Sequence, residues 1–139
     1  MDGRRDLAGI ERLSLFADLA PPELEAALSQ LRPMSFREGE WVLRQGDEAS
    51  GVFVILDGEV AVVIDGKEVA VLARGSFFGE ISVLLGEAAT ADIVARAPVH
   101  CLTIDAPAVE GFLVDYPRFT VRVLQAEARR LRDAGRARI

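Results

Sequence analysis

The sequence predicts one mainly β domain with helices at both ends. Its 139 residues, half of them hydrophobic, are enough to bury a single core. Between about residues 32 and 105 the apolar residues come in short runs broken by glycine, as in an all-β barrel or sandwich. On both sides of this region the apolar residues recur every three or four positions, which is the period of an amphipathic helix.

The first segment, residues 1–31, is expected to form two short helices. Pro21 and Pro22 suit the first turn of the second helix, because the N–H that proline lacks has no partner there. The helix-spaced apolar residues are Leu7, Ile10, Leu13, Leu15, Phe16 and Leu19, and then Leu24, Leu28 and Leu31.

The middle segment, residues 32–105, is expected to hold eight strands. Asp65-Gly66 separates two apolar runs and is typical of a two-residue hairpin turn. Trp41 and Phe53 are expected in the core, and His100 is interpreted as a hydrogen-bonded strand residue. The expected strands are Pro33–Arg37, Trp41–Arg44, Val52–Asp57, Glu59–Ile64, Lys67–Ala73, Ser76–Phe78, Thr90–Arg96 and Val99–Ile104.

The last segment, residues 106–139, is expected to be helical. Asp105 is the predicted N-cap of a first helix, and Pro117 begins a long second helix that ends near Gly135. This long helix has two apolar rows, which leaves three alternatives open: packing on its own barrel, pairing with a second copy, or covering a pocket as a lid. The rows are Val121, Leu124, Ala128 and Leu131, and Phe119, Val123 and Ala126.

A short helix over residues 80–85 is the candidate site. Gly79 ends an apolar run, and Ile81, Leu84 and Leu85 share one face of the helix that follows. Free N–H groups at a helix start favour an anion, and the Glu80 carboxylate beside them would accept sugar hydroxyls. Together these groups suit a ribose phosphate. The alternative is a turn glycine followed by an ordinary surface acid.

This stretch resembles the phosphate-binding cassette of the cyclic-nucleotide-binding domain family, and residues 39–47 and 52–60 resemble its other glycine-marked strands. The resemblance implies an eight-stranded jelly-roll β-barrel, a double-stranded β-helix, that binds cAMP or cGMP. By the same resemblance Glu80 would hold the ribose 2′-hydroxyl, and amides around Gly79, Ile81 and Ala91 would line the phosphate. The implied ligand-binding residues are Gly79, Glu80, Ile81, Ser82, Ala89, Thr90 and Ala91.

The chain departs from the family pattern at Ala89, where the resemblance implies an arginine that pairs with the phosphate. A charge-assisted hydrogen bond is worth about 1.5–3 kcal/mol, so its loss weakens binding by about one to two decades. Strand alternation predicts that Ala89, Ala91 and Ile93 face inward. Arg74 is one candidate to replace the missing guanidinium.

Composition narrows the function classes. One cysteine and one histidine exclude an intrachain disulfide and argue against a protein-built metal centre. The net charge is −6, although residues 118–139 hold seven arginines against two acids. The acidic body argues against nucleic-acid binding, and the basic end suits a solvated helix face or contact with an acidic surface. Without an apolar run of membrane-spanning length, a cytoplasmic protein is expected.

We therefore expect a non-catalytic regulatory module of this family, with cAMP or cGMP as the ligand. The alternative is a ligand-free scaffold that uses the last helix for homodimerisation or for docking on an effector protein. An enzyme is not expected, because no nucleophile and base occur together. Residues 1–139 are interpreted as one domain without a DNA-binding domain, either a lone sensor or a module of a larger protein.

Overall fold

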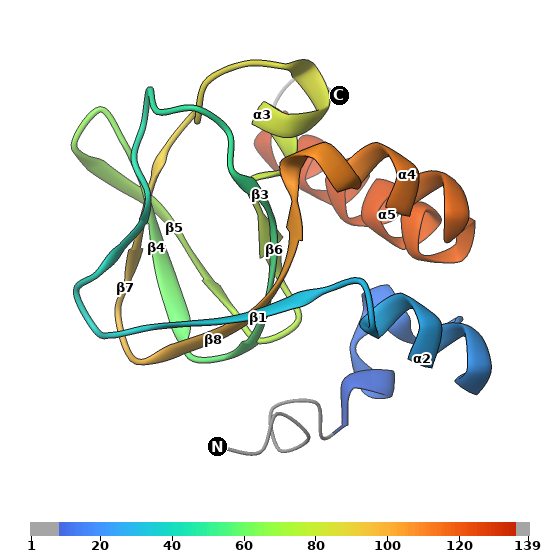
Figure 1. Ribbon diagram of the computed structural model, residues 1–139. Helices are drawn as coiled ribbons and strands as arrows, with labels where there is room; N and C mark the ends of the chain where they lie inside the picture. The colour runs from blue at the N-terminus through green and yellow to red at the C-terminus, as the bar shows by residue number, and fades with distance from the viewer. Residues whose placement is uncertain (1–8, 136–139) are drawn as a thin grey trace.

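The computed structural model describes residues 9–135 and shows two four-stranded antiparallel sheets (Figure 1). The first sheet has the order β1-β8-β3-β6 and the second the order β2-β7-β4-β5. The strands are β1 (Arg32–Phe36), β2 (Trp41–Leu43), β3 (Gly51–Asp57), β4 (Glu59–Ile64), β5 (Lys67–Ala73), β6 (Phe77–Phe78), β7 (Asp92–Ala95) and β8 (Val99–Asp105).

The predicted fold class, an eight-stranded jelly roll with flanking helices, is confirmed. All eight expected strands are present with bounds close to those expected, although β7 begins at Asp92 rather than Thr90. The hairpin prediction is also confirmed. Asp65 and Gly66 both have positive φ, 52° and 79°, and they join β4 to β5 where Ile64 pairs with Lys67.

Strand β3 is buried on both faces, and it separates two apolar cores. Phe53 and Ile55 point between the two sheets, where they meet residues such as Val60 and Ile93. Val52 and Val54, on the other face, pack against the helices. Because both faces are covered, the strand is almost continuously apolar instead of alternating with polar residues.

The helices lie together on one side of the sheets (Figure 1). Phe119 of the last helix packs against Phe16 and Phe112, with ring centroids 5.3 and 5.1 Å apart, and so joins the two ends of the chain. The helical elements are η1 (Ile10–Arg12), η2 (Ser14–Phe16), α2 (Pro21–Leu28), α3 (Glu80–Leu85), η3 (Ala106–Ala108), α4 (Val109–Asp115) and α5 (Pro117–Ala134).

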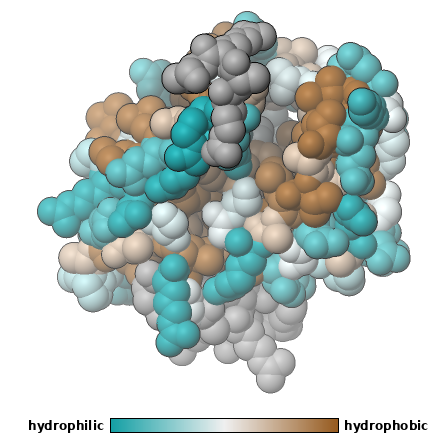
Figure 2. All heavy atoms as spheres, turned by 180° about the vertical axis from the view of Figure 1, so that it is seen from behind, coloured by the Kyte–Doolittle hydropathy of each residue, from teal (hydrophilic) through white to brown (hydrophobic). Residues whose placement is uncertain are grey.

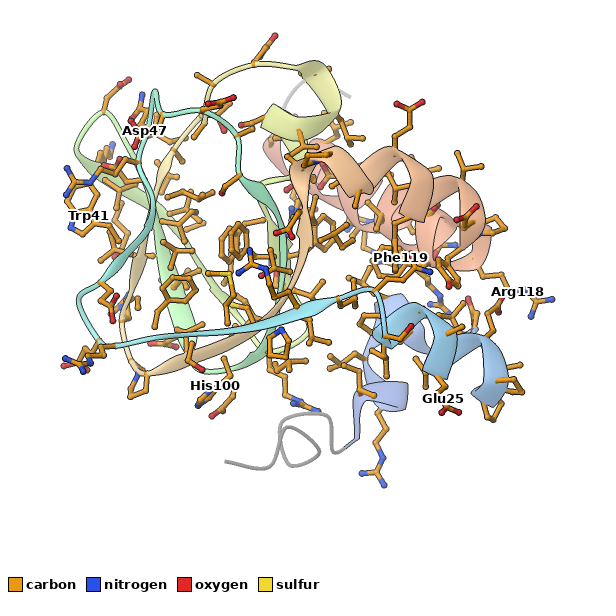
Figure 3. All side chains as sticks on the ribbon, in the orientation of Figure 1. Glu25, Trp41, Asp47, His100, Arg118 and Phe119 are labelled. Carbon is orange, nitrogen blue, oxygen red and sulfur yellow. The ribbon has the colours of Figure 1, made fainter. Side chains whose placement is uncertain are left out.

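Three expectations need correction. The first N-terminal helix is instead the pair of 3₁₀ turns η1 and η2, and Leu7 lies outside the described residues. Trp41 is 49% exposed and lies on the outer side of the barrel (Figure 3), where the Arg44 guanidinium stacks on its ring at 4.4 Å. Asp105 precedes η3 but makes no capping bond, because its carboxylate accepts a 2.7 Å hydrogen bond from Arg32.

Helix α5 buries one of its two apolar rows and exposes the other. Phe119 and Val123 are 1% and 7% exposed, whereas Leu124 and Leu131 are 61% and 73% exposed. Apolar patches lie among polar side chains on the face of the molecule shown in Figure 2. One of the arginines of α5 is paired within the chain, because Arg122 forms an ion pair with Asp18 at 2.7 Å.

None of the described helices combines the length and the apolar character that crossing a membrane requires.

Candidate functional site

A pocket of about 270 Å³ lies between α3, β6 and the inner face of the second sheet. Apolar side chains of β2, β4, β5 and β7 form its inner wall. The α3 segment and the 89–91 loop form another side, and Arg130 of α5 reaches it from the helical side. The lining residues are Leu43, Val62, Ala70, Leu72, Phe77, Phe78, Gly79, Glu80, Ile81, Ser82, Ala89, Thr90, Ala91, Ile93 and Arg130.

Two glycines set the position of α3. Gly79 precedes the helix with φ of 89°, and Gly86 follows it with φ of 67°, both left-handed conformations that suit glycine. A Cβ atom at Gly79 would clash with the carbonyl oxygen of Gly51. Gly79 therefore lets the chain turn from β6 into α3 while lying directly against β3.

Glu80 is the buried acid of the pocket. Although it begins a helix, a place where acids are usually solvated, its exposure is only 4%. Its Oε2 atom lies 3.3 Å from Nη1 of Arg130. The same Nη1 donates to Oε1 of Glu127 at 3.0 Å, so two carboxylates share one guanidinium. The shared guanidinium connects α3 to α5.

Arg130 is held by further contacts. Its Nη2 donates to Ser76 Oγ at 3.1 Å and to the Phe77 carbonyl oxygen at 2.8 Å. The guanidinium also lies over the Phe77 ring, 4.3 Å from the centroid, in a cation–π contact. Four acceptors and one ring therefore fix the place of this side chain at the pocket edge.

The surroundings of Glu80 change its ionisation. Burial, together with the hydrogen bond and the negative charge of Glu127, raises the pKa of Glu80 to about 7, and Arg130 opposes this shift only in part. Glu80 therefore exchanges its proton near neutral pH, where an exposed glutamate is fully ionised.

The residues expected on the site from the sequence lie together in this pocket, but not all are equally accessible. Ala89 and Ala91 are buried, at 6% and 8%, and the inward direction expected for them and for Ile93 agrees with this. Ser82 is buried and donates its hydroxyl to the Ala88 carbonyl oxygen at 3.1 Å, which ties α3 to the following loop. Ile81 is 44% exposed, and Thr90, which also lines the pocket, is exposed.

The apolar face of α3 is largely exposed. Ile81, Leu84 and Leu85 share one face, but Leu84 and Leu85 are 53% and 63% exposed. The helix instead buries Glu80 and Ser82. Arg74 does not replace the missing cassette arginine, because it is absent from the pocket wall and its Nη1 donates to the Leu56 carbonyl oxygen at 2.5 Å.

Sequence reasoning missed Arg130 and Glu127. They stand three residues apart on α5, about 50 residues after Glu80, and nothing local distinguishes Arg130 from the other arginines near it. One signal could have pointed to Arg130. It follows Val123 and Ala126 at helical spacing, so it lies close to the helix face that packs on the core.

Outside the pocket, the described residues form no metal-binding cluster, and the single histidine lies on a strand. Residues 9–135 contain no cluster of three or more His, Cys, Asp or Glu side chains that could hold a metal ion. His100 lies on β8 with its Nδ1 2.8 Å from Ser35 Oγ, which agrees with its interpretation as a hydrogen-bonded strand residue.

A family model and a curated relative both match this chain. Residues 33–116 match the family model of the cyclic nucleotide-binding domain. The chain is 35% identical over 103 residues to the cGMP-dependent protein kinase egl-4 of Caenorhabditis briggsae, covering 69% of this chain and 14% of the kinase. It therefore spans a small part of that relative's length.

The solved structures that are similar to this chain include the following two. The Thermus thermophilus catabolite activator protein superposes with a TM-score of 0.77 at 28% identity, over 87% of this chain and 59% of that one. The regulatory subunit of a cAMP-independent protein kinase A from Trypanosoma brucei, as a triple mutant bound to cAMP, gives a TM-score of 0.73 at 25% identity. That match covers 90% of this chain and 47% of the kinase chain.

The raised pKa of Glu80 predicts that stability changes with pH. In the unfolded chain the carboxyl has its ordinary pKa of 4.5, so folding favours the protonated form. This contribution to stability is complete below pH 4.5 and is lost as the pH rises through 7. From pH 5.5 to 8 we expect the Glu80 contribution to the free energy of unfolding to fall by about 2 kcal/mol.

Urea unfolding of the wild type and of Glu80→Gln at both pH values checks this expectation. The uncharged amide does not titrate, so the variant should lose that part of the pH dependence. Equal pH dependence in the two proteins would contradict the assignment. Glu110→Gln, which removes an exposed acid from α4, serves as the control and should follow the wild type.

Proposed function

Because the chain belongs to the cyclic nucleotide-binding domain family, we propose that it is a non-catalytic regulatory module that binds a cyclic nucleotide, cAMP or cGMP. The observation that carries this proposal is the buried Glu80 carboxylate, which lies in a pocket and is joined there to the last helix. A carboxylate accepts hydrogen bonds from paired sugar hydroxyls without needing a charged partner on the ligand.

In this proposal the ribose lies against Glu80 and the base against the apolar wall. The backbone amides around Gly79, Ile81 and Ala91 receive the phosphate, with Ser82 and Thr90 beside them. The buried methyl group of Ala89 lies among them, so no side-chain cation from this loop pairs with the phosphate. We therefore expect weak binding of cAMP and cGMP.

The contacts of Arg130 support a regulatory output. Ligand hydroxyls and the guanidinium would share the same carboxylate, so binding would change how firmly α5 is held. Such a change follows only if the ligand has different affinities for the two positions of α5. An effector protein that contacts α5 would then respond to the ligand.

One neighbour bears on the missing arginine. The Trypanosoma brucei regulatory subunit belongs to a kinase described as cAMP-independent, and its triple mutant, in which one threonine becomes arginine, was solved with cAMP bound. This relative supports the view that members of the fold differ in their response to cAMP.

The second candidate function is a ligand-free scaffold that forms a homodimer through α5. The observation in its favour is the exposed apolar row of Val121, Leu124 and Leu131, with exposures of 49, 61 and 73%. An apolar row on a long helix is a common contact surface between protein chains.

Restoring the missing arginine tests the first function. We expect calorimetric titration of the wild type with cAMP and cGMP to give weak binding, and Ala89→Arg to tighten it about ten- to a hundred-fold, the value of one charge-assisted bond. Ala88→Arg places the same charge on the neighbouring, exposed residue and should leave the affinity nearly unchanged. The cyclic-nucleotide proposal is rejected if neither wild type nor Ala89→Arg binds at millimolar concentration.

A charge in the exposed row tests the second function. We expect light scattering after size exclusion to show a dimer of the wild type at tens of micromolar and a monomer of Leu124→Glu, because a buried unpaired charge opposes association. Gln125→Glu adds the same charge to an exposed neighbouring position outside the row and should remain dimeric. A wild type that stays monomeric at every concentration rejects the homodimer.

A further inference from the structure

The pocket has few charged groups and none of them is unpaired. Its only charged lining residues, within the part of the chain that is described, are Glu80 and Arg130, and these two form an ion pair with each other. The inner wall is aliphatic, with Leu43, Val62 and Leu72 among its members. An entering ligand would thus meet a hydroxyl acceptor and apolar walls.

Arg130 is poorly placed to receive a phosphate. Its two terminal nitrogens already donate to Glu80, Glu127, Ser76 and the Phe77 carbonyl oxygen, at 2.8 to 3.3 Å. A phosphate that captured this guanidinium would leave the two carboxylates without their cation. Leaving a buried charge unpaired costs several kcal/mol, so the exchange is unfavourable.

A phosphate elsewhere in the pocket would meet no side-chain cation. Where the 89–91 loop lines the pocket, Ala89 and Ala91 present buried methyl groups. The negative charge would then have backbone amides but no side-chain cation to oppose it, in a largely apolar site that also holds Glu80. An uncharged ligand avoids both the desolvation of a phosphate and its repulsion by this acid.

Among the side chains that line the pocket, Glu80 is the acid that can accept hydrogen bonds from a ligand. A carboxyl group has about four lone-pair positions; Arg130 donates to one of them on Oε2, and the Glu80 side chain shares a further hydrogen bond with Glu127. Hydroxyl groups satisfy the remaining positions without adding charge. A flat ring system would lie against the aliphatic wall, because the Phe77 and Phe78 rings are themselves buried, the first under Arg130 and the second against Phe53.

We propose that this pocket selects an uncharged ligand that carries a ring system and a pair of hydroxyl groups, of the nucleoside class, over the corresponding cyclic nucleotide. This inference rests on the proposed function in one respect, namely that ribose hydroxyls lie against Glu80. It differs in the ligand, because it assigns no binding role to a phosphate.

Calorimetric titration of the full chain with adenosine, guanosine, cAMP and cGMP tests the inference. We expect at least one nucleoside to bind about ten-fold or more tightly than its own cyclic phosphate. A cyclic nucleotide that binds more tightly than its nucleoside overturns the inference and leaves the proposed function standing. No heat from any of the four at millimolar concentration overturns the inference, and it overturns the proposed function as well if Ala89→Arg also fails to bind cAMP and cGMP.

The position of the hydroxyls is tested separately. For the nucleoside that binds, the 2′-deoxy form should bind the wild type at least about five-fold more weakly, and Glu80→Gln should weaken the parent nucleoside while the exposed control Glu110→Gln does not. Equal affinity for the two sugars overturns the assignment to Glu80, even if Glu80→Gln fails to fold.

The Ala89→Arg variant separates the two ligand classes. It should tighten cAMP or cGMP while changing the affinity for the nucleoside by less than about two-fold, because the new guanidinium has no phosphate to meet. A nucleoside that gains as much as the cyclic nucleotide overturns the inference, since the pocket would then respond to the arginine for another reason.

Discussion

The shared guanidinium of Arg130 is the contact on which the arrangement of the site depends. Glu80 is too deeply buried for water to stabilise its charge, and an isolated carboxylate there would cost several kcal/mol. Arg130 and the partial protonation of Glu80 both reduce this cost. The acid can stay in the pocket because α5 brings a cation to it.

The same contact gives the pocket its chemistry. A ligand that bonds Glu80 acts on a group that α5 also holds, so occupancy of the pocket and docking of the last helix are linked. In the 89–91 loop, the buried methyl group of Ala89 adds to the apolar lining of the pocket. The acid is therefore retained while the cation expected from the family resemblance is absent.

Much of the fold could be predicted from the sequence because its signals are local. Glycines and the Asp65-Gly66 turn marked the strand ends, and the alternation of apolar residues placed Ala89 and Ala91 inward. The sequence signals were insufficient where a neighbouring element decides the outcome. Periodicity grouped Ile81, Leu84 and Leu85 on one face of α3, but it carries no information on whether another element covers that face.

The site could be predicted only in part for the same reason. The glycines and Glu80 belong to one continuous stretch, whereas Arg130 reaches Glu80 from a helix about 50 residues later in the chain. Trp41 shows that residue type alone does not predict burial. It is expected in the core, but it lies on an outer strand face, where it is 49% exposed and its ring stacks with the Arg44 guanidinium.

A double-mutant cycle on Glu80→Gln and Arg130→Met, measured as free energies of unfolding, tests most directly whether this contact joins pocket and helix. We expect a coupling of about 1–3 kcal/mol, well above that of the exposed pair Glu68 and Arg96, whose side-chain atoms lie 3.4 Å apart. A coupling for Glu80 and Arg130 as small as that of the exposed pair would contradict it.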